Sequence, residues 1–293
     1  MTGESDQTRA VAVIGLGRIG GGMTKNLLRA GRAVTAVDIS EPAVDVFRSR
    51  ATIARTPAEA AAECDTVLIA VADARQVEDV LLGPDGVIAA GRPVGVAVHS
   101  TIARASFLRL AGEGRHNDLT VVDASITGPS TAADAGRLVT FVGGTETEFR
   151  RFEPVFAAFS ERVLHMGPLG AGITAKIARN VLSMASLALA YEASRLALAA
   201  GVDVLKLEEA IRISDKHIGG LAAAFQWMSD ESTFHSNGFE TRARADWTAS
   251  MVTKDLTAAL DLGAEVGVEL PLVRLAEERT EAVFAQQLKP GGR

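Results

Sequence analysis

The sequence predicts an α/β protein with a parallel sheet covered by helices on both faces, followed by an all-α domain that a long helix joins to it. Three observations support this fold. Short β-branched runs alternate with helical stretches over the first half, a glycine-rich loop follows the first of these runs, and only helical patterns remain beyond residue 162. The 293 residues are enough for two domains.

The expected strands are nearly continuous apolar runs, which is typical of strands buried on both faces of a parallel sheet. They cover residues 10–14, 33–38, 66–71, 93–98, 119–124 and 138–143. The spacing between them leaves room for a helix in each connection. We therefore expect an α/β domain over residues 1–168.

The second half is rich in Ala and Leu and shows helical periodicity. One long pattern runs from Gly172 to about Ala199, and further helices are expected over 203–213, 242–266 and 271–287. We expect residues 169–293 to form a helical domain.

Composition excludes several classes of protein. The net charge is −6, the pI is near 5.5, and no Lys/Arg run is present, which argues against a nucleic-acid partner. The apolar stretch 181–198 is interrupted by Tyr191, Glu192 and Arg195, and the N-terminus is polar, so we expect no membrane partner and a cytoplasmic location. A single cysteine, Cys64, and five histidines without ligand spacing predict neither a disulfide nor a metal site.

The glycine-rich loop predicts a dinucleotide site. Gly15, Gly17 and Gly20 have the G-x-G-x-x-G spacing between an apolar run and a helical pattern, and Asp38 ends the next run, 18 residues after Gly20. Missing side chains let backbone N–H groups and a helix N-terminus approach a pyrophosphate. The loop therefore indicates a Rossmann-like domain; the alternative is a tightly packed turn without a ligand.

The cofactor is expected to be NAD, with NADP possible. The Asp38 carboxylate can accept hydrogen bonds from both ribose hydroxyls and would repel a 2′-phosphate; alternatively, Asp38 only caps a helix over 41–49, a role that Ser40 could also fill. The predicted cofactor-binding residues at this stage are Gly15, Leu16, Gly17, Arg18, Ile19, Gly20, Asp38, Val71 and Ala72.

Four blocks together resemble the β-hydroxyacid dehydrogenase family, which includes 3-hydroxyisobutyrate dehydrogenase, tartronate semialdehyde reductase and 6-phosphogluconate dehydrogenase. They are "GLGRIGGGM" after the first strand, "STI" at 100–102, "DASITGPSTAADAGRLVTFVGG" at 123–144, and "GAGITAKIARN" with "KDLTAALDLGAEVGVELP" at 170–180 and 254–271. The resemblance covers nearly the whole chain and implies NAD(P)-linked hydride transfer to or from a small hydroxy acid.

The resemblance implies that Lys176 is the general acid/base and that Asn180 helps to hold the substrate. Helical geometry agrees, because residues i and i+4 share a face. The family's substrate loop falls on residues 123–129, where Ser125, Thr127 and Gly128 are expected to bind the substrate carboxylate. Pro129 departs from the family pattern and removes a backbone N–H. Thr127 could instead stabilise only its own turn.

Three further residues carry expected roles from the same resemblance. Thr101 is expected beside the cofactor, Lys254 near the nicotinamide and the substrate, and Trp247 at the pocket wall. Lys254 with Asp255 could also be a solvated charged stretch, and Trp247 could be a core or dimer contact.

Lys176 lies near the start of the long helix, where the positive end of the helix dipole disfavours an ammonium. This effect suits a general base, because a lysine can accept a proton only when its neutral form is accessible. Arg179 lies on the same side of the helix; we expect it to recognise a second polar or anionic group of the substrate, although it could instead form a salt bridge. Relatives that decarboxylate their product carry a histidine and a glutamate at the positions of Arg179 and Ser183, so oxidation without decarboxylation is expected.

The predicted function is therefore that of an NAD(P)-dependent β-hydroxyacid dehydrogenase acting on a small, 3-hydroxyisobutyrate-like acid or the matching semialdehyde. The resemblance also implies that the helical domain, residues 169–293, carries substrate-binding and dimerisation surfaces, so the chain is expected to be a homodimer or homotetramer. Two alternatives stay open: an imine reductase on the same fold, although such relatives generally replace the lysine, and a non-catalytic dinucleotide-binding module. The sequence assigns no role to His99.

Overall fold

A computed structural model of the protein describes residues 10–220, 222 and 242–287. By their internal contacts the residues form two compact units, Met1–Arg179 and Asn180–Arg293. The division falls inside one long helix, α8 (Ala171–Ala199), so its first turns belong to the first unit. The predicted boundary after residue 168 lies just before this helix.

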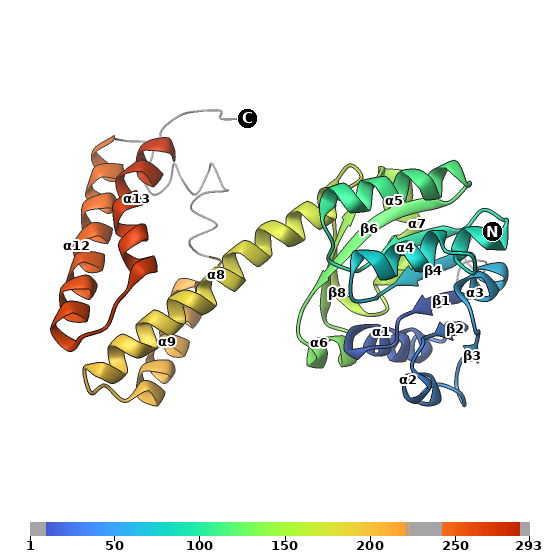
Figure 1. Ribbon diagram of the computed structural model, residues 1–293, viewed down its shortest axis with the longest axis horizontal. Helices are drawn as coiled ribbons and strands as arrows, with labels where there is room; N and C mark the ends of the chain where they lie inside the picture. The colour runs from blue at the N-terminus through green and yellow to red at the C-terminus, as the bar shows by residue number, and fades with distance from the viewer. Residues whose placement is uncertain (1–9, 221, 223–241, 288–293) are drawn as a thin grey trace. The chain divides into compact units, whose positions relative to one another are not determined.

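The first unit alternates strands and helices (Figure 1). Its strands are β1 (Val11–Ile14), β2 (Val34–Val37), β3 (Thr52–Ile53), β4 (Thr66–Ile69), β5 (Gly95–Val98), β6 (Thr120–Thr127), β7 (Leu138–Gly143) and β8 (Ser160–Gly167). Its helices before α8 are α1 (Arg18–Arg29), α2 (Glu41–Asp45), α3 (Pro57–Glu63), α4 (Ala74–Leu82), the 3-10 turn η1 (Val87–Ala90), α5 (Arg104–His116), α6 (Ser130–Asp134) and α7 (Glu146–Phe156).

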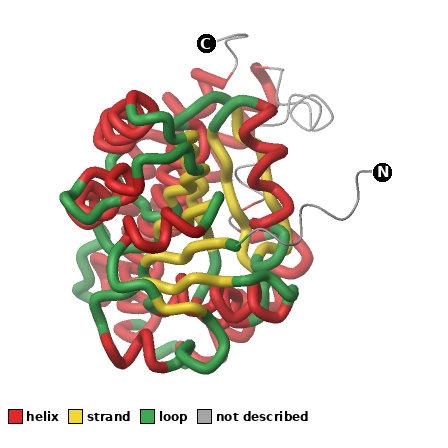
Figure 2. Tube along the Cα trace, turned by 90° about the vertical axis from the view of Figure 1, so that its right-hand side faces the viewer, coloured by secondary structure: helices red, strands yellow, loops and turns green. Residues whose placement is uncertain are grey.

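The strands form one eight-stranded sheet in the order β3-β2-β1-β4-β5-β6-β7-β8, seen as adjacent yellow strands in Figure 2. The chain moves outward from β1 to β3 and then returns to place β4 on the other side of β1. This reversal of strand order at the carboxyl ends of parallel strands is where α/β sheets bind their ligands. The fold class predicted from the sequence is confirmed.

One part of that prediction is wrong: the sheet is not parallel throughout, because β7 runs antiparallel to β6. The remaining neighbouring pairs are parallel. The segment between β6 and β7 holds only the five-residue helix α6, and a parallel crossover needs a dozen or more connecting residues. Between β7 and β8 the eleven-residue helix α7 provides such a crossover.

Two strands were not predicted. β3 has only two residues, and β8, with the sequence SERVLHMG, is mostly exposed or half-buried at the edge of the sheet. Neither contains an apolar run, so a search for buried strands misses both. Each extends one end of the sheet and leaves the central strands unchanged.

A separate apolar core covers each face of the sheet. One contains Met23 and Leu27 of α1 together with Phe152 and Phe156 of α7. The other contains buried side chains of α3, α4 and α5, such as Phe107. Because both faces are covered, polar groups of the sheet can meet a ligand only at its strand ends.

The second unit is helical, as predicted. Besides most of α8 it contains α9 (Val204–Ile218), α12 (Arg242–Val266) and α13 (Pro271–Gln287). Glu192, one of the charges in the apolar stretch of α8, is buried, and its carboxylate accepts hydrogen bonds from the backbone N–H groups of Leu272 (2.8 Å) and Val273 (3.1 Å). A carboxylate in this position stabilises the N-terminus of α13.

The helix α8 exposes much apolar surface. Val181, Met184 and Leu187 are 66%, 56% and 65% exposed. By length and composition alone α8 could cross a membrane, since its most apolar 18-residue window has a mean hydropathy of 1.2 and is 11% buried. One such helix is weak evidence for a membrane, and its apolar face is equally suited to a protein partner.

Candidate active site

The glycine loop joins β1 to α1 and is pressed against the end of β4. Gly15 has a φ of +92°, and a Cβ there would lie 2.5 Å from the carbonyl oxygen of Ala70. A Cβ at Gly20 would overlap the carbonyl oxygen of Gly15, whereas a Cβ at Gly17 would meet no atom within 4 Å. The loop is therefore packed tightly on one side and open at Gly17. The open side gives an anion access to the backbone at the α1 N-terminus.

Asp38, directly after β2, is tied to this loop. Its Oδ2 accepts a hydrogen bond from the backbone N–H of Leu16 (2.6 Å), and its Oδ1 accepts one from the N–H of Ser40 (2.8 Å). Each carboxylate oxygen keeps capacity for a further donor. Asp38 also lines a cavity of about 450 Å³, with Ile39, Arg55 and other residues from the ends of β1 and β4 and from α4; we call it the Asp38 cavity. The residues fit a dinucleotide, because the open glycine loop and a carboxylate lie side by side here.

A second cavity of about 450 Å³, the Lys176 cavity, continues along the same edge of the sheet. It shares Gly17, Ala70, Val71 and Ala72 with the Asp38 cavity. Its lining residues are Gly17, Arg18, Ile19, Gly20, Ala70, Val71, Ala72, His99, Ser100, Thr101, Ile126, Gly128 and Lys176. The two cavities therefore adjoin each other across the ends of β1, β4, β5 and β6.

Lys176 lies in the second turn of α8 and is half-buried. Burial lowers the pKa of its ammonium from the ordinary value, and the positive charge of Arg179 lowers it further. Both effects favour the neutral amine. The structure thus places a lysine with a lowered pKa in the cavity that the glycine loop also lines.

The substrate loop reaches the same cavity at the end of β6. Gly128 has a φ of +136° and lines the cavity, while Thr127 before it is half-buried. Ser125 behaves differently: it is fully buried, and within the described residues its hydroxyl has no hydrogen-bond partner. Of the three predicted carboxylate-binding residues, Gly128 is the one that lines the Lys176 cavity.

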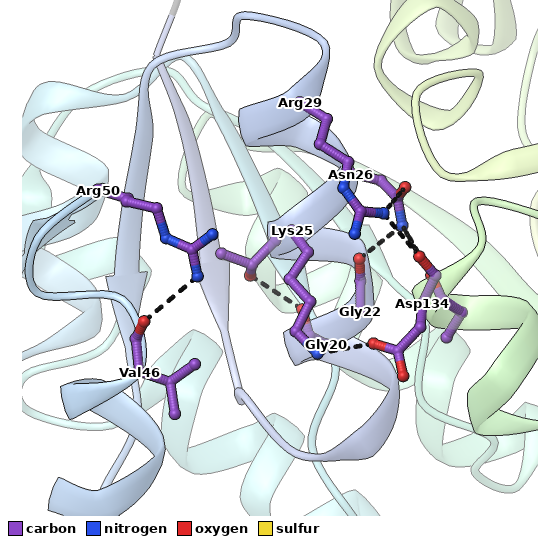
Figure 3. Close-up of polar contacts among 10 residues, drawn as sticks. Gly20, Gly22, Lys25, Asn26, Arg29, Val46, Arg50 and Asp134 are labelled. Atoms are coloured by element: carbon purple, nitrogen blue, oxygen red, sulfur yellow. Dashed lines mark hydrogen bonds and ion pairs between the residues drawn. The ribbon is translucent and has the colours of Figure 1, made fainter.

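The helix α6, which follows the substrate loop, is fastened to α1 (Figure 3). The amide of Asn26 donates hydrogen bonds to the carbonyl oxygens of Gly22 (2.8 Å) and Ala133 (2.7 Å). A Cβ at Gly22 would lie 2.8 Å from that of Ala133, and the ammonium of Lys25 lies 2.7 Å from a carboxylate oxygen of Asp134. This α1–α6 contact holds the substrate loop at a set distance from the helix that begins at the glycine loop.

The remaining predicted site residues lie farther along the chain. Arg179 and Asn180 follow Lys176 in α8. Trp247 and Lys254 lie on α12; Trp247 is 53% exposed, and the ammonium of Lys254 pairs with Asp255 at 3.1 Å. The roles proposed for these four residues stay predictions.

Three residues in this region gained no role from the sequence. Ile126 and His99 line the Lys176 cavity, and Asp123 on β6 accepts hydrogen bonds from the start of α8. His99 is buried, with Nδ1 2.6 Å from the carbonyl oxygen of Ala124; among the residues that the structure describes, none partners its Nε2. No local spacing could have revealed these contacts, since each joins residues at least 25 positions apart.

Comparison with known families accounts for this arrangement. The NAD-binding domain of 6-phosphogluconate dehydrogenase matches residues 10–167, and the NAD-binding domain of NADP-dependent 3-hydroxyisobutyrate dehydrogenase matches residues 170–292. The chain belongs to the β-hydroxyacid dehydrogenase family. It is accordingly an NAD(P)-dependent oxidoreductase, as predicted, and the prediction of a hydroxyacid dehydrogenase is confirmed.

Curated relatives of this dehydrogenase span nearly the whole chain. An oxidoreductase of Mycobacterium tuberculosis is 34% identical over 94% of this chain and 93% of its own. The NAD-dependent L-serine dehydrogenase of Pseudomonas aeruginosa is 30% identical over 92% and 90%, and the 3-hydroxyisobutyrate dehydrogenase of the same organism is 32% identical over 91% and 89%.

Solved structures agree with the fold of the dehydrogenase. An oxidoreductase from Mycobacterium avium superposes with a TM-score of 0.82 at 34% identity, covering 94% of this chain and 98% of the other. An imine reductase from Myxococcus stipitatus, in complex with NAD⁺, has a TM-score of 0.76 at 18% identity over 96% and 100%. At that identity the imine reductase shows a shared fold only.

Proposed function

We propose that the enzyme oxidises a small β-hydroxy acid of the 3-hydroxyisobutyrate type to the semialdehyde, with NAD as the preferred cofactor and without decarboxylation. One observation carries the proposal. Lys176, whose pKa is lowered by burial, lines the same cavity as the glycine loop and Gly128 of the substrate loop. A proton acceptor, a dinucleotide loop and a carboxylate-binding backbone therefore lie around one space.

Each part of the site has a chemical task in this reaction. The bound nicotinamide supplies the hydride acceptor. Neutral Lys176 takes the hydroxyl proton as the carbinol carbon is oxidised, and in the reverse direction its ammonium returns the proton. The backbone at Gly128, the substrate-loop residue that lines the cavity, holds the substrate carboxylate, so that the substrate hydroxyl is presented to the amine.

The residues of α8 favour simple oxidation. Loss of CO₂ from a β-keto acid requires a proton donor for the resulting enol, a role that relatives fill with a glutamate at the position of Ser183. A serine at neutral pH is a much weaker acid than a carboxylic acid, so the enol would lack its donor. The product expected from the enzyme is therefore the semialdehyde with its carboxylate retained.

The preference for NAD is proposed from Asp38. Its carboxylate lines the Asp38 cavity and keeps free lone pairs for ribose hydroxyls. A 2′-phosphate placed at the same position would meet a negative charge. The ratio of kcat/KM for NAD to that for NADP measures this preference, and a ratio below one would contradict it.

The substrate test is a panel of hydroxy acids assayed by the absorbance change at 340 nm. 3-Hydroxyisobutyrate and L-serine come first, because relatives at 30–32% identity are named for them, and glycerate, L-threonate and 4-hydroxybutyrate complete the panel. Lys176→Met should lower the kcat of the activity found by about 10²- to 10⁴-fold, and the matched control Lys206→Met on exposed α9 should keep it. A fully active Lys176→Met enzyme would overturn the proposed role.

An imine reductase is the alternative that the shared fold raises. An assay with a cyclic imine and NADPH, followed by the absorbance at 340 nm, distinguishes this alternative from the hydroxyacid dehydrogenase. Reduction of the imine with no activity on any hydroxy acid would favour the alternative. Activity on a hydroxy acid that depends on Lys176 would exclude it as the main reaction.

We also propose that the enzyme is a homodimer or homotetramer assembled through its helical unit. The proposal is supported by exposed apolar side chains along α8, including Val181, Met184 and Leu187, which a second subunit would cover. Light scattering in detergent-free buffer should give at least twice the chain mass. A monomer in solution, or protein recovered only with detergent, would contradict the assembly.

A further inference from the structure

Asp123 is a buried carboxylate on β6, only 1% exposed. Its Oδ1 accepts a hydrogen bond from the backbone N–H of Gly170 (2.7 Å), and its Oδ2 accepts one from the N–H of Ile173 (2.6 Å). These N–H groups belong to the N-terminal end of α8, where no intrahelical acceptor is available to them. The carboxylate therefore stabilises the start of α8 from a strand that lies 47 residues earlier in the chain.

The surroundings of Asp123 are shaped to hold a carboxylate. A Cβ at Gly143 would overlap its Oδ1, and a Cβ at Gly172 would lie 2.9 Å from its Oδ2. Glycines from β7 and α8 thus approach the charged group from two sides. Burial raises the pKa of Asp123, and the hydrogen bonds from Gly170 and Ile173 oppose that rise by favouring the anion.

Strand β6 contacts the start of α8, which carries Lys176, and also leads into the substrate loop. β6 passes from Asp123 to Thr127 and on to Gly128, which lines the Lys176 cavity. Lys176 follows Ile173 by three residues, so it lies one helical turn beyond the N–H group that Asp123 binds. A shift of Asp123 would move the lysine relative to the substrate loop.

We propose that Asp123 is a positioning residue of the dehydrogenase: by binding the N-terminus of α8 it holds the Lys176 amine at the cavity and sets how readily that amine gives up its proton. The inference rests on the proposed role of Lys176 as the general base.

The electrostatic part of the proposal follows from charges near Lys176. Arg179 on α8 and Arg18 at the start of α1 are positive, His99 across the cavity is neutral, and the Arg104 guanidinium of α5 lies beside Gly170. The cations and the positive end of the α8 dipole both disfavour an ammonium at Lys176. The negative charge of Asp123 has the opposite effect. Removing its charge should make the ammonium of Lys176 less favourable, so we expect the pKa of the amine to fall in the variant.

The test compares Asp123→Asn, Asp123→Ala and the control Asp118→Asn. Asp118 is exposed in the loop before β6 with a φ of 59°, a conformation that asparagine tolerates. Asp123→Asn keeps the shape and one acceptor but removes the charge. Asp123→Ala removes both acceptors. All three are compared with the full-length wild-type enzyme.

Two readouts need no turnover. Hydrogen exchange reports the amides of Gly170 and Ile173, which should lose protection in Asp123→Ala and keep it in Asp118→Asn. The Nζ resonance of Lys176 reports its titration, and in Asp123→Asn its pKa should fall by roughly half a unit, the size expected for one charge at a helix end. If Asp123→Ala does not fold, protection of the two amides in the wild type should still decrease as the pH is lowered until Asp123 is protonated.

The kinetic readout separates positioning from stability. For Asp123→Ala, a displacement of the lysine by an ångström should lower kcat by about 100-fold while the KM for NAD is unchanged. For Asp123→Asn, the acidic limb of the kcat profile for oxidation should move to lower pH. A wild-type profile and a wild-type Lys176 titration in a folded Asp123→Asn enzyme would overturn the inference. If Lys176→Met is instead fully active, the proposed function fails while the hydrogen-exchange result still stands.

Discussion

Acid should destabilise this enzyme through His99. The imidazole is 2% exposed and lies edge-on to the rings of Phe156 and Phe159, at centroid distances of 5.3 and 5.7 Å. Because the carbonyl of Ala124 can only accept, Nδ1 must carry the proton in that 2.6 Å hydrogen bond. Protonation would therefore occur at Nε2 and would place a charge among apolar rings.

The magnitude follows from the pKa. Burial lowers the pKa of His99 from 6.5 to about 4, although the hydrogen bond to Ala124 opposes this. The unfolded chain thus binds a proton more tightly than the folded one, so the contribution of His99 to stability is complete above pH 6.5 and is lost as the pH falls towards 4. At about 1.4 kcal/mol per pKa unit, the loss is about 3 kcal/mol.

Urea unfolding at a series of pH values between about 4 and 8 measures this loss. The matched variant is His99→Asn, whose amide can donate to Ala124 from the place of Nδ1 but does not titrate. As the pH falls over that range, the free energy of unfolding should decrease in both proteins. The decrease should be about 3 kcal/mol smaller in the variant than in the wild type. Equal pH dependence of the two proteins, or an NMR titration of folded His99 near its ordinary pKa, would refute the reasoning.

Three further predictions concern the site. Lys176→Met should lower kcat by about 10²- to 10⁴-fold, as loss of a general base does, with Lys206→Met unchanged; a smaller loss would mean that another group takes the proton. Asp38→Ser should lower the ratio of kcat/KM for NAD to that for NADP by about tenfold, the effect of about 1.4 kcal/mol, and an unchanged ratio would remove Asp38 from cofactor choice. Gly22→Ala should lower the Tm and raise the KM for the hydroxy acid, because the new methyl group would lie 2.8 Å from Ala133. Gly112→Ala in α5, where a Cβ meets nothing within 4 Å, should leave the KM unchanged; equal behaviour of both glycine variants would show that the α1–α6 contact does not position the substrate loop.

Much of the fold could be predicted because its central strands are apolar runs. β1, β2, β4, β5, β6 and β7 were each expected within a few residues of their observed bounds. The antiparallel direction of β7 was not predicted. Strand direction depends on the length of the connection between two strands, and the residues of the strand itself do not reveal it. The edge strand β8 was missed for a related reason: its exposed positions are polar and break the apolar run.

The sequence likewise revealed some residues of the candidate site and missed others. Gly15, Gly17 and Gly20 were found because their spacing is local, and Lys176 was found because it lies in a recognisable block. Asp123 lies in such a block too, yet its role could not be read from the sequence, because its partners are backbone N–H groups that any residue could supply.

The pairing of β6 with β7 has a consequence for how this active site can change. Asp123, Ser125 and Thr127 alternate with Val122, Ala124 and Ile126 along β6, and the antiparallel pairing aligns Asp123 with Gly143 and Thr127 with Val139. A slip of one residue would turn each of these side chains to the opposite face of the sheet. The start of α8 would lose its carboxylate, and the substrate loop would be displaced in the same event. An insertion within either strand would therefore disturb the lysine and the substrate loop together, so the two halves of the site cannot be changed independently through this pair of strands.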